Sequence, residues 1–157
     1  MIDGRFCFKK AQKYYDNGEF GLALKSINRA LMLNNTNYWY YQLKGEILRM
    51  QNNYKGALRQ YNKAISLNIK DDISYFCKGY LYFKQNKLSL ALKYFNKTLK
   101  LYENYNIYYW KAKIYLQKKN FNLAIKNCNM YLKLSKGYYQ ENIKEEVFKE
   151  ISRNIIC

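Results

Sequence analysis

Residues that could perform covalent or acid–base chemistry are few in this chain of 157 residues. Histidine, the commonest general base of enzymes and a frequent zinc ligand, is absent from the sequence. The glycine-rich phosphate-binding motifs and the nucleophile motif G-x-S-x-G are also absent from it. The four cysteines share no short spacing, which argues against a zinc site: Cys7, Cys77, Cys128 and Cys157. We therefore predict no enzyme, no catalytic residue, no metal, no cofactor and no small-molecule substrate.

Acidic residues cluster at helical spacing only in the segment 139–157. Ile143, Val147 and Ile151 follow one another at four-residue steps there, which predicts one apolar face of a helix. The other face carries the glutamates, as in a helix that covers a core and faces water. We predict a capping helix, and the alternative is a docking helix for another protein. The glutamates are Glu141, Glu145, Glu146 and Glu150.

Basic residues dominate the charge. The chain has 28 Lys and Arg against 11 Asp and Glu, for a formal net charge of +17. Lys, Asn and Tyr all have AT-rich codons, and the lysines are spread through every segment, so base composition explains much of this basic character. Residues 73–140 nevertheless hold 13 Lys and a single acid, Glu103. RNA binding through a lysine-rich face is therefore the alternative function.

Targeting signals are not visible in the sequence. It has no run of about 18 apolar residues, which a membrane-spanning helix requires. Its first residues lack the apolar core of a signal peptide. We expect an intracellular, cytoplasmic protein with reduced thiols and no membrane partner.

A pattern of small and aromatic residues recurs along the chain. Four alanines lie at intervals of 34, 34 and 33 residues: Ala23, Ala57, Ala91 and Ala124. Three residues before each stands an aromatic residue or leucine: Phe20, Tyr54, Leu88 and Phe121. Twelve residues before each stands a small residue: Ala11, Gly45, Gly79 and Ala112. A fixed period of this length is typical of stacked structural repeats.

The spacing within each period is that of amphipathic helices. The turns between them carry residues that tolerate the left-handed conformation, at Asn17-Gly18, Asn52-Asn53, Asn86 and Asn120. The predicted helices cover residues 4–16, 20–33, 38–50, 54–67, 72–84, 88–101, 105–118 and 121–135, and a ninth is predicted near 139–155.

The recurring pattern resembles the tetratricopeptide repeat (TPR), W-x2-L-G-x2-Y…A-x3-F…P with a period of 34 residues. Four such repeats cover about residues 4–37, 38–71, 72–104 and 105–138. The tryptophan position instead holds Cys7, Tyr41, Tyr75 and Tyr108, and the proline position holds Asn35, Ile69, Glu103 and Lys136. The resemblance implies an all-α, right-handed α-solenoid over 4–138, capped by 139–157, with the first helix of each repeat lining a concave groove.

The groove implied by the resemblance is rich in aromatic and basic residues. Such a surface suits a peptide or helix that carries acidic residues. We therefore predict a protein–protein interaction module that acts as a scaffold, adaptor or assembly subunit. The alternative is that the aromatic side chains turn sideways into the core between repeats. The predicted partner-binding residues are Trp39, Arg49, Phe76, Tyr80, Phe83, Lys84, Tyr109 and Lys113.

The best-known activity of the TPR family is a clamp for the C-terminal carboxylate of Hsp70 or Hsp90. The clamp requires Lys and Asn on the first helix, Asn on the third, and Lys and Arg on the fifth. None of the matching residues fits this requirement, so we do not expect a co-chaperone of this kind. They are Phe8, Gln12, Leu43, Ile73 and Cys77.

Overall fold

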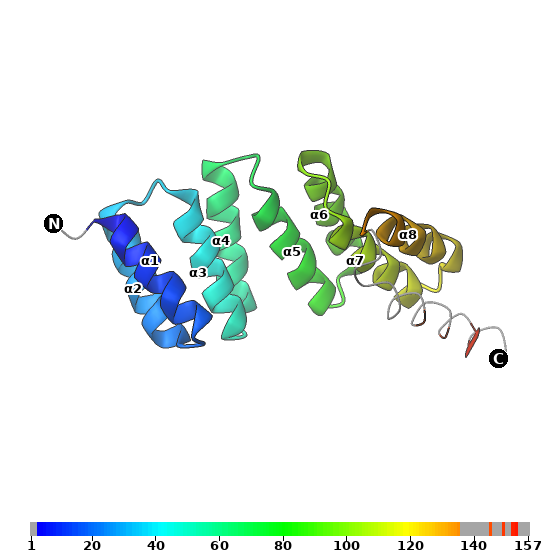
Figure 1. Cartoon of the computed structure of the whole chain (residues 1–157), viewed down its shortest axis with the longest axis horizontal. Helices are drawn as coiled ribbons and strands as arrows, with labels where there is room; N and C mark the ends of the chain where they lie inside the picture. Colours follow the sequence, from blue (N-terminus) through cyan, green and yellow to red (C-terminus); the bar gives the residue numbers. More distant parts are fainter. Residues whose placement is uncertain (1–2, 136–144, 146–148, 150–151, 154–157) are drawn as a thin grey trace. The chain divides into compact units, whose positions relative to one another are not determined.

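The computed structural model describes residues 3–135, 145, 149, 152 and 153. Residues 3–135 form eight α-helices and no β-strand (Figure 1). No helix in the described part of the chain is both long and apolar enough to cross a membrane. The helices are α1 (Gly4–Asp16), α2 (Phe20–Leu33), α3 (Tyr38–Met50), α4 (Tyr54–Leu67), α5 (Asp72–Lys84), α6 (Leu88–Leu101), α7 (Tyr105–Gln117) and α8 (Phe121–Leu134).

The eight predicted helices up to residue 135 are confirmed. Six have the predicted bounds, while α7 and α8 each end one residue earlier than predicted, at Gln117 and Leu134. The predicted capping helix lies outside the described residues, since the structure describes only 145, 149, 152 and 153 of the segment 139–157.

Two compact units make up the chain, Met1–Leu81 and Tyr82–Cys157, and the boundary between them falls inside α5. In the first unit α1 pairs with α2 and α3 pairs with α4, while α2 also packs against α3. In the second unit α7 pairs with α8 and α6 packs against α7. Three consecutive pairs thus form hairpins, α1–α2, α3–α4 and α7–α8, and within each unit the second helix of one hairpin packs on the first helix of the next at α2–α3 and α6–α7.

Left-handed residues recur where the first helix of each hairpin ends. Gly18, Asn52 and Asn86 have φ angles of 77°, 59° and 57°, and Lys119 has a φ of 54°. The prediction of a left-handed residue at Asn120 is therefore wrong by one position. Asn120 instead caps α8 by accepting a hydrogen bond from the backbone N–H of Leu123 at 3.1 Å.

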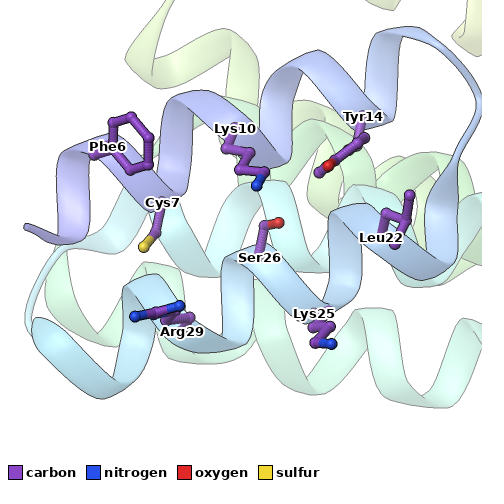
Figure 2. Close-up of a pocket in the computed structure, with 8 residues that line it drawn as sticks. All are labelled: Phe6, Cys7, Lys10, Tyr14, Leu22, Lys25, Ser26 and Arg29. Carbon is purple, nitrogen blue, oxygen red and sulfur yellow. The ribbon is translucent and has the colours of Figure 1, made fainter. Parts of the chain in front are cut away.

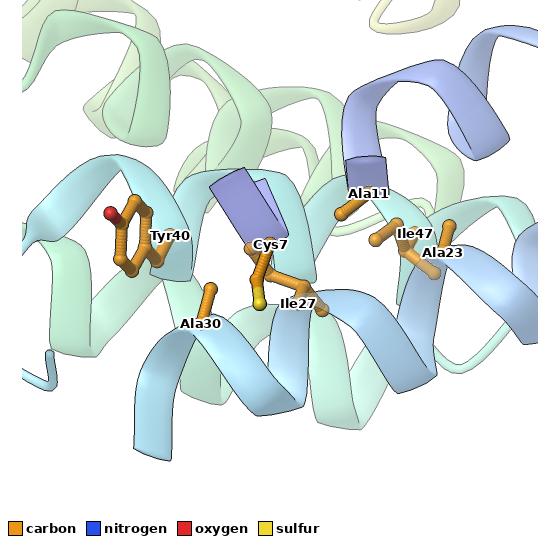
Figure 3. Packing of buried hydrophobic residues seen from close by; sticks show 7 residues of the cluster. All are labelled: Cys7, Ala11, Ala23, Ile27, Ala30, Tyr40 and Ile47. Carbon is orange, nitrogen blue, oxygen red and sulfur yellow. The ribbon is translucent and has the colours of Figure 1, made fainter. Parts of the chain in front are cut away.

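Small residues allow the helices of the first unit to approach closely. Ala11 on α1 and Ala23 and Ala30 on α2 are fully buried. Larger side chains fill the space between these alanines, so the packing is dense without a large residue at every contact. Figure 3 shows the cluster, which consists of Cys7, Ala11, Ala23, Ile27, Ala30, Tyr40 and Ile47.

Candidate functional site

The carboxylate of Glu46 and the guanidinium of Arg49 form an ion pair on α3, about one helical turn apart. Arg49 donates to Oε2 of Glu46 from Nε at 3.0 Å and from Nη2 at 2.7 Å. The hydroxyl of Tyr61, from α4, donates to the other carboxylate oxygen of Glu46. The side chains of Glu46 and Arg49 are each 24% exposed. The predicted site residue Arg49 is therefore held in place by a largely buried polar network.

Burial and hydrogen bonding oppose each other at Glu46. Burial alone would raise the pKa of this carboxyl group, but the hydrogen bonds from Arg49 and Tyr61 outweigh burial and hold the pKa below its usual 4.5. Burial and the nearby Glu46 carboxylate raise the pKa of the Cys77 thiol. At neutral pH the network therefore holds one carboxylate, one guanidinium and a neutral thiol, which is a poor nucleophile.

Arg49 also connects the network to the aromatic residues of α5. Its guanidinium carbon lies 5.7 Å from the ring centroid of Tyr80, within the range of a cation–π contact. Phe76, one turn earlier on α5, packs against the core cluster that contains Leu48 and Tyr61. The structure thus brings Arg49 and Tyr80 together, whereas Phe76 turns partly into the core, which was the alternative considered for the aromatic residues.

Trp39 remains the most accessible of the predicted aromatic residues in the first unit. It lies in the first turn of α3 and is 53% exposed. Its ring centroid is 5.2 Å from that of Tyr38. An indole with this much exposed surface offers apolar contact area to a partner.

The second unit contains the other four predicted residues, and Trp110 connects two of them. Its ring centroid is 5.3 Å from that of Phe83 and 5.1 Å from that of Tyr109. Lys113 donates to the hydroxyl of Tyr109 at 3.1 Å, and its Nζ lies 5.1 Å from the Tyr109 ring centroid. Lys84 ends α5 and is exposed.

Sequence reasoning missed Trp110. In the repeat register Trp110 corresponds to Lys9, which is exposed, and to Leu43 and Cys77, which pack in clusters with helices of the preceding hairpin. These counterparts share no single environment, so the period did not mark Trp110 as a binding residue. The signal that could have identified it is its size, because an indole does not fit into the space of a leucine or a cysteine.

The described residues hold no group of three or more Cys, Asp and Glu side chains placed to bind a metal ion. Cys7, Cys77 and Cys128 are free and buried. Cys7 packs in the core cluster of the first unit, whereas Cys77 also belongs to the polar network of Glu46.

Two family models match the chain. The model described as "TPR repeat" matches residues 45–86, and the model described as "Tetratricopeptide repeat" matches residues 78–139. Together they span residues 45–139. No curated protein sequence matches the chain.

Solved structures with the same fold include TPR proteins of low sequence identity. A crystal structure of MamA superposes with a TM-score of 0.80 at 20% identity, over 88% of this chain and 81% of that chain. A chain of the APC/C hetero-tetramer Cut9–Hcn1 superposes with a TM-score of 0.82 at 18% identity, over 96% of this chain and 30% of that chain. PilF of Pseudomonas aeruginosa superposes with a TM-score of 0.79 at 17% identity, over 96% of this chain and 71% of that chain. These similarities show an all-α helical repeat solenoid, and with the matched repeats they establish that the protein belongs to the tetratricopeptide repeat family.

Proposed function

We propose that this TPR protein is a non-catalytic interaction module that binds a peptide or helix of a partner protein, as a scaffold, adaptor or assembly subunit. The observation that carries the proposal is a cation held over an aromatic ring in each unit. Arg49 lies over Tyr80 in the first unit, and Lys113 lies over Tyr109 in the second. Rings and cations held in place before binding lower the entropy cost of recognition.

The two units contribute differently to this proposed recognition. In the first unit the charge of Arg49 is balanced by Glu46, so the contribution there is mainly aromatic surface, above all that of Trp39. In the second unit Lys84 and Lys113 lie in a stretch of the chain, 82–135, whose only acidic residue is Glu103. We therefore assign apolar side chains of the partner to the first unit and its acidic side chains to the second.

The proposed recognition does not use a carboxylate clamp. Phe8 stands at one of the clamp positions, and its ring stacks on Tyr40 with centroids 5.0 Å apart. Cys77, at another clamp position, is buried in the core cluster that contains Leu48 and Tyr61. Neither side chain carries the charge that would bind a terminal carboxylate, so the partner segment need not be a C-terminus.

RNA binding is the second candidate function. The observation that favours it is the ratio of 13 Lys to one acid in residues 73–140. Lysine contacts to phosphates would give binding that is blind to sequence and falls steeply with salt. One of these lysines, Lys111, already donates to Oδ1 of Asn96 at 2.9 Å, so part of the charge serves packing between helices.

Affinity capture from a cell lysate, with partners identified by mass spectrometry with and without nuclease, tests the proposal. We expect Trp39→Ala, and separately Tyr109→Ala, to lose a partner that the wild-type protein retains after nuclease treatment. Tyr102→Ala is the matched control, because Tyr102 is an exposed aromatic residue outside both sites. Capture unchanged in Trp39→Ala, Tyr109→Ala and the double variant Tyr80→Ala/Phe83→Ala contradicts the proposal.

The same experiment identifies the alternative. If nuclease abolishes capture, and purified RNA binds with a steep salt dependence that Trp39→Ala leaves unchanged, the lysine-rich face is the functional surface and the RNA function holds.

A further inference from the structure

A pocket of about 350 Å³ opens between α1 and α2 of the first hairpin. Figure 2 shows Lys10 pointing from α1 toward α2, where Ser26 lies below it. Three of the eight lining residues are cations, and none of the eight is acidic. They are Phe6, Cys7, Lys10 and Tyr14 from α1, and Leu22, Lys25, Ser26 and Arg29 from α2.

The repeat register shows what covers this face in the other hairpins. Phe6 corresponds to Tyr40, Ser74 and Ile107, which are 2%, 0% and 0% exposed, whereas Phe6 is 58% exposed. Tyr40 lies on α3, which packs against α2, and Ile107 lies on α7, which packs against α6. The covering element is thus the second helix of the preceding hairpin. No described residue covers Phe6 in this way.

In the repeat register Lys10 corresponds to a lysine in each of the other hairpins: Lys44, Lys78 and Lys111. Lys78 donates to Oδ1 of Asn62 on α4 at 2.6 Å, and Lys111 donates to Oδ1 of Asn96 on α6 at 2.9 Å. Asn62 and Asn96 occupy the same register position of their own helices. Two of the three counterparts therefore donate to a side-chain oxygen at the same register position of the preceding helix.

We propose that the pocket face of the first hairpin docks an acidic amphipathic helix of a partner protein. The helix would lie on α1 as α2 lies on α3, with apolar residues over Phe6 and Leu22 and a carboxylate opposite Lys10. A carboxylate fits better than an amide because Lys25 and Arg29 add two further cations to the same pocket. This surface is separate from the aromatic residues of α3, α5 and α7 and does not depend on the function proposed for them.

Synthetic peptides test this docking with the full chain. The template is the 14-residue sequence of α6, Leu88–Leu101, because α6 covers the equivalent face of α7. The probe is a fluorescent, helix-stapled version with Lys93, Asn96 and Lys97 all changed to Glu, and the comparison peptide keeps the natural residues. We expect the acidic peptide to bind at least about tenfold more tightly than the basic peptide.

Three variants of the protein locate the binding. Lys10→Glu and Phe6→Asp should each weaken binding of the acidic peptide by at least about tenfold. Both positions are exposed, and unchanged circular dichroism spectra would confirm that the variants fold. Lys9→Glu makes the same charge change at an exposed neighbour that does not line the pocket and should leave binding unchanged.

Several results would overturn the inference. These are no binding of the acidic peptide, equal binding of the basic peptide, or full binding by Lys10→Glu and Phe6→Asp. Self-association of the wild-type protein that is lost in Phe6→Asp would show that a second copy of this basic chain covers the face instead. Binding lost in Trp39→Ala but kept in Lys10→Glu would place the peptide on the aromatic residues.

Discussion

The phenol ring of Tyr61 occupies the space that a side chain at Gly45 would need. A Cβ atom on Gly45 would lie 2.8 Å from Cδ1 and 2.9 Å from Cζ of that ring. The ring cannot easily move aside, because Tyr61 is fully buried and its hydroxyl donates to the carboxylate of Glu46. Glycine at residue 45 therefore allows α3 and α4 to approach closely and places the hydroxyl of Tyr61 beside Glu46.

Gly45→Ala should destabilise the protein although alanine is the better helix former. Overpacking against Tyr61 costs about 1–3 kcal/mol, and the gain in helix propensity returns at most about 1 kcal/mol. We expect a lower midpoint of urea unfolding, followed by circular dichroism. Gly21→Ala is the control, because a Cβ there meets no atom within 4 Å. A Gly45→Ala midpoint that matches or exceeds the wild type would mean that the ring of Tyr61 has room to move.

The Glu46 network predicts how stability depends on pH. The pKa of Glu46 is lowered in the folded protein, so its carboxylate form stabilises the fold. This contribution is fully present above the unfolded pKa of about 4.5 and is lost as the pH falls through the lower folded value. Glu46→Gln removes this titration.

Urea unfolding at a series of pH values measures this effect. The difference in free energy of unfolding between wild type and Glu46→Gln should be largest near neutral pH and shrink on acidification below about pH 4.5. Glu19→Gln makes the same change at an exposed site. Its free energy of unfolding should follow the pH dependence of the wild type more closely than that of Glu46→Gln does. A constant difference at every pH would show that Glu46 does not contribute through its charge.

The sequence was sufficient to predict the helices because several local signals agree. Alanines at a fixed period define the close contacts, and Ala23, Ala57 and Ala91 are all fully buried. Asparagine or glycine marks the ends of the first three hairpin turns, at Gly18 and Asn52 among others, with the expected positive φ angles. Periodicity and turn residues each constrain the same boundaries, so few alternatives remain.

The site could be predicted only in part, because it depends on contacts between helices. Arg49 was predicted to steer an acidic partner, but its guanidinium is paired with Glu46 one turn earlier on α3. Charge counts also did not reveal that Lys78 is buried, since its acceptor Asn62 lies on another helix. Repeat spacing fixes which face of a helix a residue occupies, whereas the rotamer and partner of a long side chain depend on its neighbours in space.

The contact between Lys78 and Asn62 should show an asymmetry between its two partners. Asn62→Ala removes the side-chain oxygen that a largely buried ammonium group receives at 2.6 Å, and we expect a loss of about 1–3 kcal/mol. Lys78→Met replaces the charge by an apolar chain of similar length, and we expect it to cost less than Asn62→Ala.

Urea unfolding of both variants and of the double variant checks this expectation. In the background of Lys78→Met, the change Asn62→Ala should have little effect, because the ammonium group is absent. Additive losses in the double variant would show that the two side chains do not stabilise the fold through their contact.

Lys119 is a non-glycine residue in the left-handed conformation, with a φ of 54°. This conformation costs roughly 1–2 kcal/mol for an ordinary L-residue, and the equivalent residues of the other hairpins are Gly18, Asn52 and Asn86. Lys119→Gly should therefore raise the free energy of unfolding by about 0.5–1 kcal/mol, after the larger backbone entropy of glycine in the unfolded chain is subtracted. Lys118→Gly removes the same charge at a residue with a φ of −82° and should lower stability instead. Equal changes in the free energy of unfolding of Lys119→Gly and Lys118→Gly would mean that the lost charge, and not the backbone conformation, determines the effect.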